Sequence, residues 1–360
     1  MKTSSLLFCV AICVVLAAQT SSAQTVAVGN CRPHLVSYST ISAAVAAVAP
    51  NSTVLVCPGT YPEQVTITQS LTLRGVNDGT GGNPVITVPR GGLVGNPAQL
   101  SVAYISEFVV STVDIANFVV DGADSGFDCS TSLLAGIYYD NASGSLDNVE
   151  VRNQNPGGCG VGIWLIGGPT VVDTVNIRNS SIHHFDDTGI LAGSPGSTGF
   201  LVNVASSLVA SASPSVQAGV GYFATDGLAA HNTIVLAGGT GLQLENFYCC
   251  MTAWENTIIG ANVGILSGSN EGGPDIIVNN SLSNNGTGIA VSGIGAGAVV
   301  NSNSIVRSSI AAIDLNCSQD STVERNTIFH APLGIANVTS EDTVKRNVFY
   351  SVPALTTECQ

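Results

Sequence analysis

The sequence predicts an all-β fold, a parallel β-helix in which short strands wind into stacked coils, with a short capping helix near the N-terminus. Two landmarks recur with one shared period of about 23 residues, and the segments between them are short and rich in Val, Ile, Thr and Asn. Of the 360 residues, 40 are glycine and only 9% are charged. This composition suits short strands joined by tight turns and excludes long charged helices. A strand-built repeat of this length is typical of a solenoid.

The first landmark is an Asn followed by a small or β-branched residue and then an apolar one. Neighbouring coils of a parallel β-helix lie about 4.8 Å apart. We therefore expect equivalent Asn side chains to form hydrogen-bonded ladders inside turns that need left-handed backbone angles. The landmark begins at six positions, separated by 24, 24, 23, 23 and 21 residues: Asn232, Asn256, Asn280, Asn303, Asn326 and Asn347.

The second landmark is a Gly followed by an apolar residue, and it alternates with the first. Because side chains alternate along a strand, the residue after the inward apolar one should face water. A looser copy spans Gly219 to Phe223, and Ala312-Ile313 replaces one copy. The regular copies begin at Gly136, Gly162, Gly189, Gly241, Gly264, Gly288 and Gly334.

The first 23 residues have the pattern of a secretory signal peptide. Lys2 precedes an apolar run from Leu6 to Ala18, and small residues follow up to Ala23. This run is too short and wrongly flanked for a lasting membrane anchor. A buried N-terminal helix is the alternative. No second apolar stretch of spanning length follows, so we expect a secreted, extracellular or periplasmic protein without a membrane span.

Residues 24–360 are expected to form a single β-helix domain, with residues 24–60 as its N-terminal cap. A helix is predicted from Ile41 to Ala49, where apolar residues recur at helical spacing behind Ser39 and Thr40 as possible N-caps. Strands are predicted at Thr53–Cys57 and Val65–Leu73. A cap is needed because the end strands of a solenoid otherwise pair with other chains.

Removing the signal peptide leaves eight of the ten cysteines, an even number that suits an oxidising compartment. We predict pairing of Cys31 with Cys57, and of Cys129 with Cys159 between neighbouring repeats. A metal site is the alternative, although no two cysteines have CxxC spacing. Four cysteines remain unassigned: Cys249, Cys250, Cys317 and Cys359.

The acidic balance restricts the partners. The net charge is −14, with 24 Asp and Glu against 10 Lys and Arg. Nucleic acid is disfavoured because it is held by clustered cations. Acidic polysaccharides are disfavoured unless a divalent cation bridges the like charges. No cofactor is predicted, and no residue pattern indicates calcium.

The N-terminal strands resemble a known family. Thr53-Val54-Leu55-Val56, Pro58-Gly59-Thr60-Tyr61-Pro62-Glu63 and Leu71-Thr72-Leu73-Arg74-Gly75 resemble the opening of the pectin-lyase-like right-handed β-helix proteins. The later coils are similar to the repeats of the carbohydrate-binding and sugar-hydrolysing subset. The resemblance covers nearly all of the mature chain. It implies a right-handed coil and a polysaccharide partner.

The enzyme signatures of that family are incomplete in this chain. Gly59-Thr60-Tyr61-Pro62-Glu63 is similar to the first pectinesterase motif, but the later catalytic motifs have no counterpart. Of the polygalacturonase motifs, only an Asp-Asp pair, Asp186-Asp187, is present. The cations are too scattered for the base and calcium carboxylates of a pectate lyase. Function must therefore be argued from a site.

The densest polar cluster is His183-His184-Phe185-Asp186-Asp187. Imidazoles beside carboxylates can act as general acid or base, or can bind a metal. The alternative is an ordinary polar turn between Ile182 and Gly189, where sister coils carry other polar residues.

A second candidate site lies on the water-facing column of the Gly-led strands, where we align Tyr138, Trp164, Phe223 and Gln243. Exposed rings beside carboxylates suit a sugar, although aromatic residues also favour strand surfaces in general. Asp226 and Glu245 are expected on adjacent coils, as a hydrolytic pair of carboxylates.

The sequence thus predicts a secreted β-helix protein that binds polysaccharide along an aromatic and acidic face. One alternative is a polygalacturonase-like glycoside hydrolase that uses carboxylates among Asp186, Asp187, Asp226 and Glu245; a polysaccharide lyase is less favoured. The other alternative is a structural or adhesive surface protein without catalysis.

Overall fold

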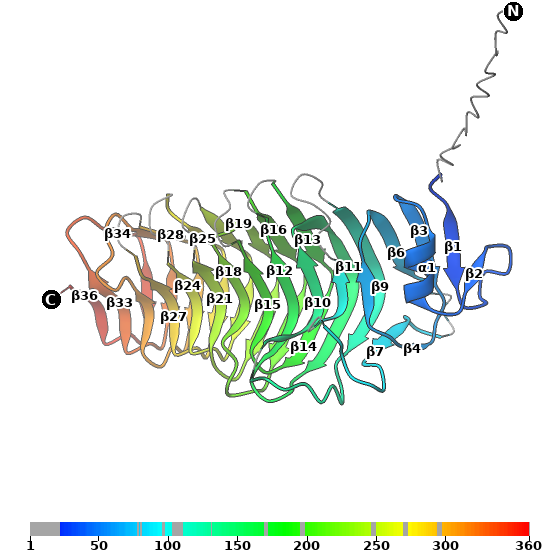
Figure 1. Cartoon of the computed structure of the whole chain (residues 1–360). Coiled ribbons are helices and arrows are strands. Elements are labelled where there is room, and N and C mark those ends of the chain that lie inside the picture. Colours follow the sequence, from blue (N-terminus) through cyan, green and yellow to red (C-terminus); the bar gives the residue numbers. More distant parts are fainter. Residues whose placement is uncertain are drawn as a thin grey trace, which may run out of the picture.

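The computed structural model describes residues 22–77, 79, 81–95, 98–102, 111–130, 132–168, 172–194, 199–245, 250–268, 273–293 and 297–359. Within these ranges the chain has one α-helix and many short strands, stacked along one long axis (Figure 1). Every strand pairing between described residues is parallel, for example Trp164 with Leu191 and Ile265 with Ile289. The predicted parallel β-helix is confirmed.

Each coil contributes one strand to each of three faces, which we call faces I, II and III in chain order. Face I consists of β5 (Val65–Ile67), β8 (Ala98–Val102), β10 (Leu134–Asp140), β12 (Gly160–Ile166), β15 (Thr188–Gly193), β18 (Ala218–Phe223), β21 (Thr240–Glu245), β24 (Val263–Ser267), β27 (Thr287–Val291), β30 (Ala311–Asp314), β33 (Leu333–Val338) and β36 (Ala354–Glu358).

Face II consists of β1 (Thr25–Val28), β3 (Ser52–Val56), β6 (Leu71–Gly75), the first halves of β9 (Ser111–Asp121) and β11 (Ala142–Gln154), β13 (Thr174–Arg178), β16 (Leu201–Ala205), β19 (Asp226–Ala230), β22 (Met251–Trp254), β25 (Ile276–Val278), β28 (Val299–Asn301), β31 (Thr322–Glu324) and β34 (Thr343–Lys345). The short strand β2 (Ser37–Tyr38) pairs with β1.

Face III consists of β4 (Thr60–Pro62), β7 (Val85–Thr87), the second halves of β9 and β11, β14 (Ser181–Phe185), β17 (Leu208–Ser211), β20 (Thr233–Leu236), β23 (Thr257–Ile259), β26 (Ser281–Ser283), β29 (Ser304–Val306), β32 (Thr327–Phe329) and β35 (Val348–Tyr350).

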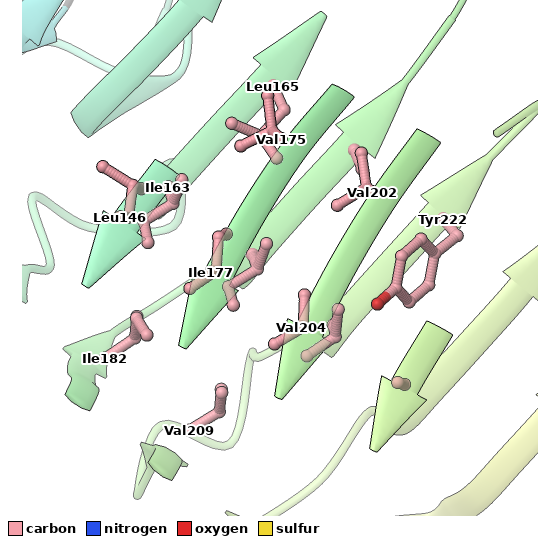
Figure 2. Close-up of a cluster of buried hydrophobic side chains, with 14 of the residues drawn as sticks. Leu146, Ile163, Leu165, Val175, Ile177, Ile182, Val202, Val204, Val209 and Tyr222 are labelled. Carbon is pink, nitrogen blue, oxygen red and sulfur yellow. The ribbon is translucent and has the colours of Figure 1, made fainter. Parts of the chain in front are cut away.

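The core lies between the three faces, because every second residue of a strand points inward. Figure 2 shows Ile163 and Leu165 of face I gathered with Val175 and Ile177 of face II and Ile182 of face III. These five side chains are at most 1% exposed. Burying one such side chain contributes about 1.5–3 kcal/mol, so the stacked core is the main source of stability.

The predicted Asn ladder is present between faces II and III. Asn280 Oδ1 accepts from the backbone N (2.9 Å) and Nδ2 (3.0 Å) of Asn256, and Asn280 Nδ2 donates to Asn303 Oδ1 (3.0 Å). The same Nδ2–Oδ1 bond joins each pair from Asn232 to Asn347. The left-handed residue, however, is the one before each ladder residue, such as Asn279 (φ 58°). Our assignment of left-handed angles to the ladder Asn was wrong.

The glycine landmark has a different cause from the one expected. Gly264 and its equivalents do not adopt a positive φ. A Cβ atom on Gly264 would lie 2.5 Å from the carbonyl oxygen of Gly288 and 2.5 Å from Leu282 Cδ2. Glycine is required here because the backbone of the next coil and the side chain of Leu282 leave no room for a Cβ atom.

Helix α1 (Ile41–Ala47) ends two residues earlier than predicted, and its buried residues pack on the first coils. Thr40 Oγ1 accepts from the backbone N of Ala43 at 3.1 Å, which confirms one of the predicted caps. The Glu63 carboxylate accepts from the backbone N of Ile41 and of Ser42, both at 3.0 Å. The segment that resembles a pectinesterase motif thus anchors the N-terminus of this helix.

The strand predicted at Val65–Leu73 is in fact two strands, β5 and β6, separated by a corner at 68–70. Gln69 in this corner donates from Nε2 to the carbonyl oxygens of Val45 (3.1 Å) and Val48 (2.8 Å). These bonds satisfy acceptors at the C-terminal end of α1. The corner at 68–70 thus places the Gln69 side-chain amide beside the end of the helix.

Both predicted disulfides are present, Cys31–Cys57 near the N-terminus and Cys129–Cys159 between neighbouring coils. A third joins Cys317 to Cys359 near the C-terminal end, a pairing that the sequence left unassigned. Cys249 lies outside the described residues.

Residues 1–21 also lie outside the described residues, so the signal peptide and the division into a cap and one domain stay predictions. Among the helices that the structure describes, none has the length and apolar character needed to cross a membrane.

Candidate functional site

The His183–Asp187 segment does not form one convergent cluster. The sequence offered a polar turn for this segment, but His183, His184 and Phe185 belong to the end of strand β14. His183 points outward from face III, and its Nε2 lies 3.2 Å from Glu150 Oε1. His184 has a left-handed φ of 57°, and its Nδ1 lies 2.6 Å from Nδ1 of His183. The two imidazoles therefore face the surface of face III.

The carboxylates of Asp186 and Asp187 make their hydrogen bonds to other groups than these imidazoles. The Asp186 carboxylate accepts from the backbone N of Gly157 and Gly158, each at 2.7 Å, and of Gly160 at 2.6 Å. This anchors the loop that carries Cys159. Asp187 accepts from Thr188 Oγ1 (2.7 Å) and Gln217 Nε2 (3.0 Å), and burial raises its pKa. Both carboxylates are only 7% exposed.

The second candidate site lies on the outer surface of face I. There Tyr138 of β10 is paired in register with Trp164 of β12. Their ring centroids are 5.1 Å apart with the planes inclined at 51°. The residues on either side of Trp164, Ile163 and Leu165, are fully buried, so the indole faces outward as the alternation predicted. We call Tyr138, Asp140, Trp164, Leu191, Phe223, Gln243 and Glu245 the aromatic face.

Phe223 does not stand in the column to which the sequence assigned it. Leu191 is paired with Gly221, and Gly193 with Phe223, so the predicted register was wrong by two residues. Phe223 Cε2 nevertheless lies 2.9 Å from the place where a Cβ atom of Gly221 would be, and Leu191 Cδ1 lies 3.8 Å from it. The phenyl ring thus covers Gly221 beside Leu191, and it continues the apolar strip.

A carboxyl group lies at the start of this strip. Asp140, two residues after Tyr138, is hydrogen-bonded to the Tyr138 phenol. Burial raises the pKa of Asp140, although the bond from Tyr138 opposes this effect. Burial, followed by the Asp140 charge, also raises the pKa of the Tyr138 phenol. Both groups therefore keep their protons to a higher pH than in water, and the Tyr138 hydroxyl donates its hydrogen bond to Asp140.

A second buried carboxyl supports this end of the face. Asp173, fully buried before β13, accepts from the backbone N of Gly168 at 3.1 Å. Burial raises its pKa, and the nearby Asp140 charge adds to the effect. Asp173 was not among the predicted site residues, because it lies in a corner between faces I and II that carries neither landmark. The only available signal was an acidic residue in an otherwise apolar and small-residue stretch.

The other end of the aromatic face carries Gln243 and Glu245 of β21. Gln243 Nε2 donates to Glu245 Oε1 at 2.7 Å, and Glu245 is paired in register with Phe223. Asp226 lies one coil earlier, as predicted, but it begins β19 on face II and is paired with Leu201. Burial raises the pKa of Asp226. The proposed pair of carboxylates is therefore divided between two faces, and its hydrolytic role stays a prediction.

The described ranges contain no group of three or more His, Cys, Asp or Glu side chains that could hold a metal ion. The imidazoles of His183 and His184 are engaged with each other and with Glu150.

The sequence matches no protein family model and no curated protein. The structure, however, is similar to solved β-helix proteins. The A-module of the mannuronan C-5 epimerase AlgE4 from Azotobacter vinelandii has a TM-score of 0.55 and 14% identity, covering 88% of this chain and 90% of its own. An alginate lyase from Paenibacillus sp. str. FPU-7 has a TM-score of 0.51 and 14% identity, with coverages of 92% and 97%. The GH136 lacto-N-biosidase from Eubacterium ramulus has a TM-score of 0.55 and 11% identity, with coverages of 91% and 68%.

The chain has the fold of a right-handed parallel β-helix. The resemblance found in the segment from Ile41 to Gly75 is thereby confirmed for the fold. At identities of 11–14%, these similarities show the fold alone, so the chemistry of this chain must be argued from its site.

Proposed function

We propose that this protein is secreted and binds a neutral or weakly charged polysaccharide along the aromatic face. The observation that carries the proposal is the outward pair of Tyr138 and Trp164 on adjacent coils, with ring centroids 5.1 Å apart. The C–H faces of sugar rings pack on such aromatic surfaces, while sugar hydroxyls bond to carboxyl and amide groups. Asp140 at one end of the face and Gln243 with Glu245 at the other supply these groups.

The dimensions of the aromatic face suit a polymer. From β10 to β21 it crosses five successive coils, about 19 Å at the usual strand spacing of roughly 4.8 Å. Its apolar strip runs along the axis over Trp164, Leu191 and Phe223 and ends in polar groups on both sides, which suits an extended glycan. The net charge of −14 favours a glycan without dense negative charge. The similar structures include a mannuronan C-5 epimerase, an alginate lyase and a lacto-N-biosidase, which supports carbohydrate as the ligand class.

Trp164→Ala tests the proposal, and Trp254→Ala is its matched control because these are the two tryptophans of the chain. Trp254 is 37% exposed but lies on face II, where its indole contacts His231. We expect Trp164→Ala to weaken binding to the best glycan of a neutral polysaccharide panel at least about tenfold, since a lost aromatic contact of about 1.4 kcal/mol corresponds to this factor. Affinity electrophoresis or calorimetry measures it. Equal retention of both variants would support a structural or adhesive protein instead.

Glycoside hydrolysis is the second candidate function, and the raised pKa of Asp140 on the aromatic face favours it, because a general acid must hold its proton. Glu245 lies four coils further on, about 19 Å away at the usual strand spacing, which is too far for the two carboxyl groups to act as one pair. We expect Asp140→Asn to lower turnover at least about 100-fold while binding persists, because a positioned acid contributes about that factor or more, and Glu245→Gln to leave turnover nearly unchanged. Reducing-end assays measure turnover. If the unaltered protein cleaves no glycan that it binds, binding alone is its function.

A further inference from the structure

Two adjoining hollows lie outside the aromatic face, on face III and the corner that follows it. The first has a volume of about 350 Å³ and the second about 530 Å³. Both are lined by His184, Ser211 and Ala212, so they meet at these residues. Cavities of several hundred Å³ are of the size that holds small ligands.

The first hollow follows from the register of face III. His183 of β14, Ala210 of β17 and Val235 of β20 stand in one outward column on three successive coils. The short Ala210 side chain between two larger neighbours leaves a notch one coil wide. Its walls are an imidazole on one side and an isopropyl group on the other, and its floor is apolar.

The second hollow continues from His184 toward the loop held by Asp186. It is lined by backbone of Gly157 and Gly158 and by the hydroxyls of Ser213 and Ser215, which are 2.9 Å apart. Glycines at these two positions, both with positive φ, leave the wall open to a ligand. The two hollows thus combine apolar and hydroxyl-rich surfaces on either side of one imidazole.

The charges around the hollows are already paired. Glu150 Oε1 lies 3.2 Å from His183 Nε2 and 2.9 Å from Arg152 Nη1, and Arg152 Nε lies 2.8 Å from Asp121 Oδ2. The Asp186 carboxylate is occupied by three backbone N–H groups. This chain of contacts holds His183 in place, and the charges of Glu150, Arg152 and Asp186 beside the hollows are all paired.

We propose that these hollows form a second carbohydrate site, which takes two consecutive units of a neutral oligosaccharide with His184 between them. The C–H face of one sugar packs on Ala210 and Val235, and the hydroxyls of the next bond to Ser213 and Ser215. The site is separate from the aromatic face, so either one can be lost without the other.

Histidine side-chain NMR tests the proposal, because the chain has only five histidines. The probes are maltohexaose, cellohexaose, mannohexaose and xylohexaose at millimolar concentration. His184→Asn removes the imidazole while keeping a residue that tolerates the left-handed angle. His330→Asn is the matched control, because His330 has the same turn position six coils further on and a φ of 53°.

We expect at least one hexasaccharide to shift the ring signals of His183 and His184 but not that of His330. This shift should persist in Trp164→Ala, and the affinity should fall at least about tenfold in His184→Asn and in Ala210→Leu, which fills the notch. Ser283→Leu, at the same outward column of β26, should not change it. If no probe moves the His183 and His184 signals while binding to the aromatic face persists, the second site is refuted and the proposed function stands. If the shifts occur but Trp164→Ala leaves all other binding unchanged, the second site stands and the aromatic-face proposal falls.

Discussion

A single buried carboxyl shows how the surroundings of one residue control its chemistry. Asp275 is fully buried in the corner before β25. It accepts from Ser267 Oγ at 2.6 Å and from the backbone N of Met251 at 2.9 Å. These bonds favour the charged form, but burial outweighs them and raises the pKa of Asp275 to about 6. The folded protein therefore holds this proton more tightly than the unfolded chain does.

This raised pKa predicts a pH dependence of stability. Between the unfolded value of 3.8 and the folded value of about 6, the folded state binds the extra proton, so the free energy of unfolding falls as the pH rises. The contribution lost is about 3 kcal/mol at about 1.4 kcal/mol per pH unit. Asp275→Asn, which keeps both hydrogen bonds, should remove this fall. Urea unfolding from pH 4 to pH 7 measures it, with the exposed Asp320→Asn as the control. Parallel profiles for all three proteins would contradict the assignment.

At the scale of the secondary-structure elements, the Asn ladder links the turns of successive coils. Each ladder Asn serves as acceptor for one neighbour and donor for the next, and it is buried from Asn232 to Asn326. A buried polar group that loses its partner costs about 1–3 kcal/mol. Each bond of the ladder therefore stabilises the fold only while the Asn residues of both coils are present.

Asn280→Ala should interrupt the ladder. The change leaves two donors of Asn256, its backbone N and Nδ2, without their acceptor, so we expect a loss of about 3 kcal/mol or more in the free energy of unfolding. Chemical denaturation measures it. Asn203→Ala is the control, because Asn203 makes an exposed Asn–Asn bond on face II. Its effect should stay within about 0.5 kcal/mol. Comparable losses in the two variants would mean that a buried ladder bond stabilises the fold no more than an exposed Asn–Asn bond.

The whole molecule behaves as a linear array in which each coil is supported by its two neighbours. Ile265 is fully buried and stacked in register between Leu242 and Ile289. A charged side chain at position 265 would lose the apolar contacts with both Leu242 and Ile289. Since an unpaired buried ion is costly, neighbouring coils should be lost together rather than one by one.

Ile265→Asp should therefore destabilise the protein by more than about 3 kcal/mol and should unfold several coils as one unit. Hydrogen exchange, followed coil by coil, measures the extent of the unfolded region. Leu266→Asp, one residue along and facing outward, is the control and should leave exchange almost unchanged. Fraying confined to β24 would contradict the cooperative stack.

The repeat of the sequence was enough to predict the fold, because stacking requires like residues at like positions in every coil. It predicted the ladder from Asn232 to Asn347 and the outward direction of Trp164. It failed at Phe223, because Gly219-Val220 and Gly221-Tyr222 both fit the landmark, and the structure shows that Val220 is the residue in register with Ile190 and Leu242. The candidate site was only partly predictable: Asp140 and Glu245 lie on face I, but the hydrogen bonds that withdraw Asp186 come from a loop without any repeat.

The ladder also bears on how such a chain can change in length. Its Asn–Asn bonds join residues 21 to 24 positions apart, which is one coil, so each coil makes the same bond to the next coil. A duplicated copy of residues 232–255 would therefore find the same hydrogen-bond partners as the original. The length of the binding surface can then change by whole coils, to match longer or shorter glycans, without a change in the core.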